Sequence, residues 1–231
     1  MSSTAKAPIA VALDVADLPT AVEVASAVAP NVQTLKIGLQ SYLRDGADGV
    51  RTVMDAAPGT ELFLDLKLHD IPNTVAGAAK SVAPLNPALL TVHASGGPAM
   101  IEAAATALPD TLITAVTILT SLSADDLKAL GIQGDPIEAV TRLAKLAVEA
   151  GARALVCSPL EAAAVRAVVP TDIKLVIPGV RPAGSATGDQ QRVATPQQAL
   201  ADGADLLVIG RPITTASNIA QAAQEIAHSL A

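Results

Sequence analysis

Eight short apolar runs, separated by segments of helix-forming composition, constrain the fold of this chain more than any other feature. The runs are rich in Val, Ile and Leu and nearly continuous, a pattern typical of parallel strands covered on both faces. They lie at residues 9–15, 34–39, 62–67, 89–94, 112–119, 154–158, 174–180 and 206–211. Such strands need helices packed against them, so the runs predict an α/β protein.

The segments between the runs are rich in alanine and predict helices. Clear examples lie at residues 20–29, 73–83, 98–107, 137–150 and 159–168. Asp135 precedes Pro136 and is expected to cap the helix that begins there. The segments "EAGA" (149–152) and "ADGA" (201–204) place glycine where a helix must end before the next strand.

Eight strand–helix pairs in 231 residues predict a single-domain (β/α)8 barrel, the TIM barrel. A doubly wound open sheet is the alternative, but no strong glycine-rich turn follows the first run, which favours the barrel. No linker or low-complexity tract divides the sequence. We therefore expect one domain over residues 1–231, with residues 1–8 as a flexible N-terminal tail.

Composition argues against nucleic-acid and membrane partners. The net charge is −7, no basic cluster is present, and Tyr42 and Phe63 are the only aromatic residues, so neither a nucleic-acid-binding groove nor a base-stacking platform is expected. No segment approaches the roughly 20 apolar residues of a membrane span, and residues 1–8 have no signal-peptide core. A single cysteine, Cys157, excludes an internal disulfide and fits a reducing compartment, so a cytoplasmic location is expected.

Charged residues gather at the ends of the predicted strands. In a (β/α)8 barrel the active site lies at the C-terminal strand ends. Asp14, Lys36, Asp65 and Lys67 stand in or next to otherwise apolar runs, and buried charges are costly unless they are paired. One of them alone could be an ordinary rim residue, but the set predicts an ionic network. Asp65 and Lys67 are two positions apart, hence on one face of their strand, which in a barrel is the interior.

Other polar residues near strand ends are less specific. Gly210 and Arg211 in "IGRP" follow the last strand, where barrels often bind phosphate, although Arg211 could instead form a surface ion pair. His93 is better explained as a hydrogen-bonded barrel residue than as a catalyst. His69 could contact a ligand or only the backbone of its turn.

Several segments in a fixed order resemble the bacterial type of the orotidine 5′-phosphate decarboxylase family. The most specific is "FLDLKLHDIPNTV" (63–75). It is accompanied by "VHASGG", "AVTILTS", "PGVRP", "GDQQR" and "VIGRPIT". The resemblance covers nearly the whole chain, and none of these motifs departs from the family pattern.

The resemblance implies an activity and a set of catalytic residues. Family members convert orotidine 5′-phosphate to UMP and CO2 in de novo pyrimidine synthesis, without a metal or cofactor. By motif match, Lys67 protonates the C6 carbanion, Asp65 and Asp70 flank it, and Lys36 completes the charged network. Asp14 and Lys36 hold the ribose, and Asp65 lies near the substrate carboxylate.

The resemblance also implies contacts at the other end of the substrate and between subunits. Thr120 contacts the pyrimidine. The phosphate end is served by Arg181, Gln190, Gly210 and Arg211, and the segment 179–194 is the expected lid. The working unit is a homodimer in which Asp70 and Thr74 reach into the neighbouring subunit's site.

Three other functions remain open from the sequence. A metal-dependent relative, such as a 3-keto-gulonate 6-phosphate decarboxylase or a hexulose-phosphate synthase, shares a similar Asp-x-Lys-x-x-Asp string and uses Mg²⁺. Lys36 argues against it, because it puts a cation where those relatives place an acidic ligand. A phosphosugar epimerase and an inactive barrel that only binds a nucleotide or a partner are more distant alternatives.

Overall fold

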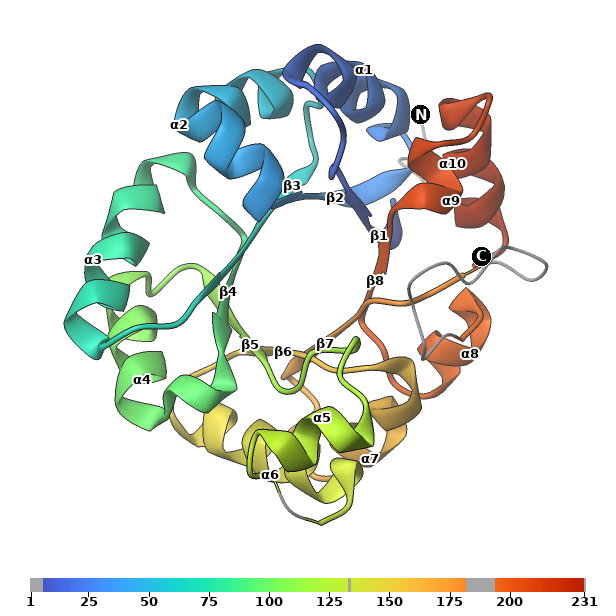
Figure 1. Cartoon of the computed structure of the whole chain (residues 1–231). Helices are drawn as coiled ribbons and strands as arrows, with labels where there is room; N and C mark the ends of the chain where they lie inside the picture. The colour runs from blue at the N-terminus through green and yellow to red at the C-terminus, as the bar shows by residue number, and fades with distance from the viewer. Residues whose placement is uncertain (1–5, 133, 182–193, 231) are drawn as a thin grey trace.

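The structure is a computed structural model that describes residues 6–132, 134–181 and 194–230. Within these residues eight parallel strands close into a barrel in sequence order, β1 pairing with β8 (Figure 1). The strands are β1 (Ala7–Ala12), β2 (Val32–Gly38), β3 (Glu61–Leu68), β4 (Leu89–His93), β5 (Leu112–Val116), β6 (Ala154–Val156), β7 (Lys174–Ile177) and β8 (Leu206–Ile209). The predicted (β/α)8 barrel is confirmed, and each of the eight runs overlaps one strand.

Helices surround the barrel on the outside (Figure 1). The α-helices are α1 (Leu18–Val28), α2 (Leu39–Asp55), α3 (Pro72–Val82), α4 (Pro98–Ala107), α5 (Ala124–Ala129), α6 (Pro136–Glu149), α7 (Ala162–Arg166), α8 (Pro196–Ala201), α9 (Arg211–Thr214) and α10 (Ile219–His228). Short 3₁₀ turns are η1 (Ala83–Leu85), η2 (Ala94–Gly96) and η3 (Pro159–Glu161). None of the helices in the described ranges is long and apolar enough to cross a membrane.

Local signals in the sequence account for several helix boundaries. Asp135 caps α6 as predicted, its carboxylate accepting a hydrogen bond from the amide of Ile137 at 2.8 Å. Gly151 and Gly203 follow α6 and α8 with φ values of 96° and 99°, a region that favours glycine. The predicted helix at 159–168 is divided into η3 and α7.

Strand alternation divides the apolar residues into two cores. The larger core lies between strands and helices and includes Ile9, Val11 and Leu64. The alternate positions, with Ala10 and Phe63 among them, form a smaller cluster inside the barrel. The charged strand residues occupy the same inward-facing positions as this cluster. The barrel interior therefore holds the small apolar cluster and, nearer the C-terminal strand ends, the charged side chains.

The N-terminal boundary of the barrel lies earlier than the sequence suggested. β1 begins at Ala7, so Ala7 and Pro8 of the expected 1–8 tail belong to the sheet. Ala7 pairs with Val32 of β2, and its amide donates a hydrogen bond to the carbonyl of Asn31 at 3.0 Å. Residues 1–5 lie outside the described residues.

Candidate active site

A cavity of about 420 Å³ opens at the C-terminal ends of the strands. Its wall combines charged groups with apolar strand residues, such as Val116, Val156 and Val208. The predicted site residues on this wall are Asp14, Lys36, Asp65, Lys67, Thr120, Arg181, Gly210 and Arg211. The fold thus brings together residues that are far apart in the sequence: Asp14 and Arg211, for example, are separated by 197 positions.

The four strand-end charges form one connected network. Lys36 Nζ lies 3.3 Å from Asp14 Oδ2 and 3.1 Å from Asp65 Oδ2. Lys67 Nζ lies 2.7 Å from Asp65 Oδ1. Asp65 therefore bridges the two lysines with its two carboxylate oxygens, and the predicted network is present.

Exposure decreases from the mouth of the cavity inward. The side chain of Asp14 is 47% exposed and that of Lys67 30%, whereas those of Asp65 and Lys36 are 13% and 8% exposed. Burial at this level strengthens the attraction between opposite charges, because little water screens it. The inner pair, Lys36 and Asp65, is consequently strongly attracted, and Asp65 of this pair also contacts the more exposed Lys67.

The surroundings keep the inner pair ionised. Burial by itself raises the pKa of Asp65, but the charges of Lys36 and Lys67 outweigh it, so its pKa lies below the usual value. Burial likewise lowers the pKa of Lys36, but the charges of Asp65 and Asp14 more than offset this, so its pKa is raised. Both groups are therefore charged at neutral pH.

Gly38 has a role at the site that the sequence did not reveal. A Cβ atom at this position would lie 2.7 Å from Asp14 Oδ1 and 3.2 Å from Lys36 Nζ. The missing side chain therefore makes room for the outer ion pair. Its position at the end of β2, two residues beyond Lys36, was the available signal.

Thr214 is a second residue that sequence reasoning missed. It lines the cavity together with Gly210 and Arg211. It lies one turn after Arg211 on α9, so the helix itself brings the two side chains to one side. The spacing in "GRPIT" was therefore the signal that could have identified it.

Two predicted site residues lie outside the cavity of this chain. Asp70 and Thr74 are exposed in the β3–α3 connection and the first turn of α3, and neither lines the cavity. The carboxylate of Asp70 accepts a hydrogen bond from the amide of Ile71 at 2.6 Å. Gln190, expected at the phosphate, and most of the 179–194 segment lie outside the described residues.

The two histidines near the site pack against each other. The ring centroids of His69 and His93 are 5.4 Å apart, and neither ring lines the cavity. Burial, followed by electrostatic interaction with His69 and Lys67, lowers the pKa of His93. His93 therefore favours the neutral form, as expected for a barrel residue.

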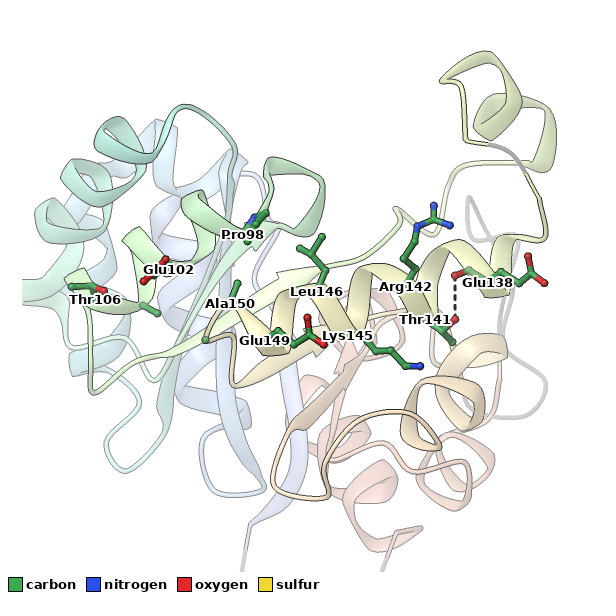
Figure 2. Close-up of a pocket in the computed structure, with 12 residues that line it drawn as sticks. Pro98, Glu102, Thr106, Glu138, Thr141, Arg142, Lys145, Leu146, Glu149 and Ala150 are labelled. Atoms are coloured by element: carbon green, nitrogen blue, oxygen red, sulfur yellow. Dashed lines mark hydrogen bonds between the residues drawn. The ribbon is translucent and has the colours of Figure 1, made fainter.

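A larger hollow of about 1020 Å³ lies on the outer surface between α4 and α6 (Figure 2). Its charged side chains, among them Glu102, Lys145 and Glu149, are exposed and of both signs. Charges in contact with water are poorly placed to act on a reacting group. The barrel mouth, where the charges of Lys36 and Asp65 are largely buried and paired, is therefore the candidate active site.

The described residues contain no cluster of metal-binding side chains. Across 6–132, 134–181 and 194–230, no group of three or more His, Cys, Asp or Glu side chains is arranged to hold a metal ion. The two carboxylates that line the cavity among the described residues, those of Asp14 and Asp65, both contact the ammonium of Lys36.

Comparison with known proteins gives a consistent family assignment. Residues 7–226 match the model of the Orotidine 5'-phosphate decarboxylase / HUMPS family. The chain is 63% identical over 224 residues to the orotidine 5'-phosphate decarboxylase of Thermobifida fusca (strain YX), covering 97% of this chain and 96% of that protein. A relative of the same name from Frankia casuarinae is 54% identical over 97% of this chain and 88% of its own length.

A solved structure supports the same assignment. The crystal structure of orotidine 5'-phosphate decarboxylase from Lactobacillus acidophilus superposes with a TM-score of 0.84 at 34% sequence identity, covering 97% of this chain and 99% of that one. Family match, sequence identity and barrel geometry agree over almost the whole length. The chain therefore belongs to the orotidine 5'-phosphate decarboxylase / HUMPS family.

Proposed function

We propose that this chain is a carboxy-lyase that converts orotidine 5′-phosphate to UMP and CO2 without a metal or cofactor. The observation that carries the proposal is the contact of Lys67 Nζ with the Asp65 carboxylate at 2.7 Å. The other oxygen of the same carboxylate contacts Lys36 Nζ at 3.1 Å. The named activity of relatives at 63% and 54% identity supports the choice of substrate.

The chemistry explains why an ammonium is needed. Breaking the bond between C6 and the carboxyl carbon leaves an electron pair on C6 that the pyrimidine ring delocalises poorly. A fixed positive charge next to C6 stabilises this carbanion, and a proton from the same group completes UMP. Lys67 supplies both, giving its proton to C6 and recovering one from water after the product leaves.

The Asp65 carboxylate pairs with the Lys67 ammonium and repels the carboxylate of the substrate. Its lowered pKa means that it remains an anion, so Lys67 stays paired with a negative charge. A substrate carboxylate placed next to Asp65 is repelled until it leaves as neutral CO2. The network thus favours the state after bond breaking over the state before it.

The rest of the substrate is assigned to the remaining wall of the cavity. Asp14 and Lys36 are proposed to hold the ribose, and Thr120 to contact the pyrimidine. The phosphate is assigned to Arg181, Arg211 and the backbone near Gly210, with Gln190 as a further contributor. Binding of the phosphate, which is remote from the reacting carbon, supplies binding energy that orients the pyrimidine ring.

A homodimer is the proposed working unit. Asp70 and Thr74 are exposed on the β3–α3 side of the mouth, where they could reach a neighbouring subunit. Large apolar side chains are exposed on the same side, with Leu43 78% and Ile71 65% exposed. Exposed apolar residues beside a site are typical of a protein interface.

The proposed compartment is the cytoplasm, since one cysteine allows no internal disulfide.

A spectrophotometric assay with EDTA tests the activity. Purified protein should remove the ultraviolet absorbance of orotidine 5′-phosphate at an unchanged rate when EDTA is added, because the proposed positive charges come from lysine. A metal-dependent phosphosugar enzyme would leave the nucleotide intact and lose its own activity with EDTA. No loss of absorbance, with or without EDTA, would overturn the proposal.

Arg211→Ala is expected to weaken use of the phosphorylated substrate, by on the order of 100-fold in kcat/KM, because a charge-assisted contact to the phosphate is lost. The unphosphorylated nucleoside, although a very poor substrate, should react equally with both enzymes. Arg142→Ala, an exposed arginine on α6, is the matched control and should resemble wild type. A large effect of Arg211→Ala on the nucleoside would argue against a phosphate role.

A further inference from the structure

The backbone of Lys67 has an unusual conformation. Its φ is 48°, a region that side chains other than glycine rarely occupy. The β3–β4 ladder is irregular at this point: Leu64 pairs with Leu90, but the next pair is Leu68 with Val92. Three residues of β3, including Lys67, therefore stand opposite the single residue Thr91 of β4. Bulges of this kind redirect a side chain.

The hydroxyl of Thr91 connects both ends of this bulge. Thr91 Oγ1 accepts a hydrogen bond from the backbone amide of Lys67 at 2.8 Å and donates one to Asp65 Oδ1 at 3.0 Å. The same Asp65 oxygen accepts from Lys67 Nζ at 2.7 Å. A hydroxyl has one proton to donate and lone pairs to accept, so both contacts are compatible. The result is a closed ring from the Lys67 backbone, through Thr91 and Asp65, to the Lys67 ammonium.

Burial makes this hydroxyl hard to replace. Thr91 is fully buried, and Asp65 is largely so. Without the hydroxyl, the Lys67 amide loses this acceptor and Asp65 Oδ1 loses one of its donors. Buried polar groups that lose a partner are strongly destabilised, so the bulge would relax toward a regular strand. Lys67 would then point in a different direction.

We propose that Thr91 is a positioning residue for Lys67, acting through the Lys67 backbone and Asp65 rather than on the substrate. Thr91 is absent from the described wall of the cavity, so a direct substrate contact is not part of its role. The inference deepens the proposed decarboxylation and rests on it. It attributes the orientation of the Lys67 ammonium to the Thr91 hydroxyl on the neighbouring strand.

Thr91→Val tests the inference, because valine keeps the shape and removes the hydroxyl. We expect kcat to fall on the order of 100-fold, the cost of misplacing a reacting group by about 1 Å, with KM nearly unchanged. Thr91→Ser keeps the hydroxyl and should restore kcat to within about threefold of wild type. UMP binding, measured by calorimetry, should be the same in all variants.

Thr34→Val is the matched control. Thr34 is another fully buried threonine on an inward position of the barrel, and its Oγ1 has no hydrogen-bond partner among the residues described. Its replacement should leave kcat unchanged. If Thr91→Val does not fold, as judged by circular dichroism, Thr91→Ala removes the same hydroxyl without adding a methyl group and takes its place.

The outcomes separate this inference from the proposed function. Wild-type protein without decarboxylase activity would refute the function, whereas an active wild type with an equally active Thr91→Val would refute the positioning role alone. A serine variant as slow as the valine variant, or a rise in KM at constant kcat, would also overturn it. A crystal structure of Thr91→Val gives a readout independent of activity: a retained positive φ at Lys67 and a retained contact to Asp65 would contradict the inference.

Discussion

Lys67→Ala is expected to abolish decarboxylation, with a loss of turnover on the order of 10⁴-fold or more, because one substitution removes both the charge that stabilises the carbanion and the proton that quenches it. The fold should persist, since Lys67 lies at the end of β3 and its side chain is 30% exposed. Turnover is measured from the loss of substrate absorbance, and folding from circular dichroism.

A second lysine provides the control for this loss. Lys145 is exposed on α6, on the outer surface of the barrel, so Lys145→Ala should retain wild-type turnover. Turnover of Lys67→Ala within about tenfold of wild type would remove Lys67 from the mechanism, because a barrier change that small does not fit an essential acid.

Recovery of activity from two inactive variants is the second large expected effect. If Asp70 acts across the dimer interface, each active site takes Lys67 from one chain and Asp70 from the other. Lys67→Ala and Asp70→Ala are each expected to be nearly inactive. In a mixed dimer one site carries both lesions and the other carries none. Random pairing makes about half of the dimers mixed, so roughly a quarter of wild-type activity should return.

A matched mixture shows whether the recovery depends on shared sites. Lys36 contacts Asp65 of its own chain at 3.1 Å, so it belongs to the same site as Lys67 of that chain. Mixing Lys67→Ala with Lys36→Ala should therefore restore nothing. Subunit exchange is verified with a tagged chain in both mixtures. Exchange without recovery for the Asp70→Ala pair would place Asp70 in its own subunit's site, or show that the enzyme works as a monomer.

The positions of the strands could be read from the sequence because buried parallel strands impose a simple local pattern. A strand covered on both faces must be apolar at nearly every position, so the eight runs stand out from the alanine-rich helices. Helix ends were equally local: Asp135 and Gly151 act on backbone groups within a few residues. The start of β1 was less clear, because Ala7 belongs to the strand through its pairing with Val32.

The kinds of charged groups at the site could also be predicted from the sequence, but their contacts with one another could not. Charged residues in apolar strands predicted a network among Asp14, Lys36, Asp65 and Lys67. The sequence could not give the order of contacts, in which Asp65 bridges both lysines while Asp14 reaches only Lys36. That order depends on the stagger of three strands, which closure of the barrel determines.

The sequence by itself therefore determined the strands, the helix caps and the kinds of groups at the strand ends, because each depends on the burial or backbone of a short segment. Tertiary structure alone decided the bulge at Lys67, the empty space that Gly38 leaves for Asp14, and the contact of Thr91 with both Lys67 and Asp65. These features arise where neighbouring strands meet, between residues as far apart in sequence as Asp65 and Thr91, and local patterns carry no information about such distances.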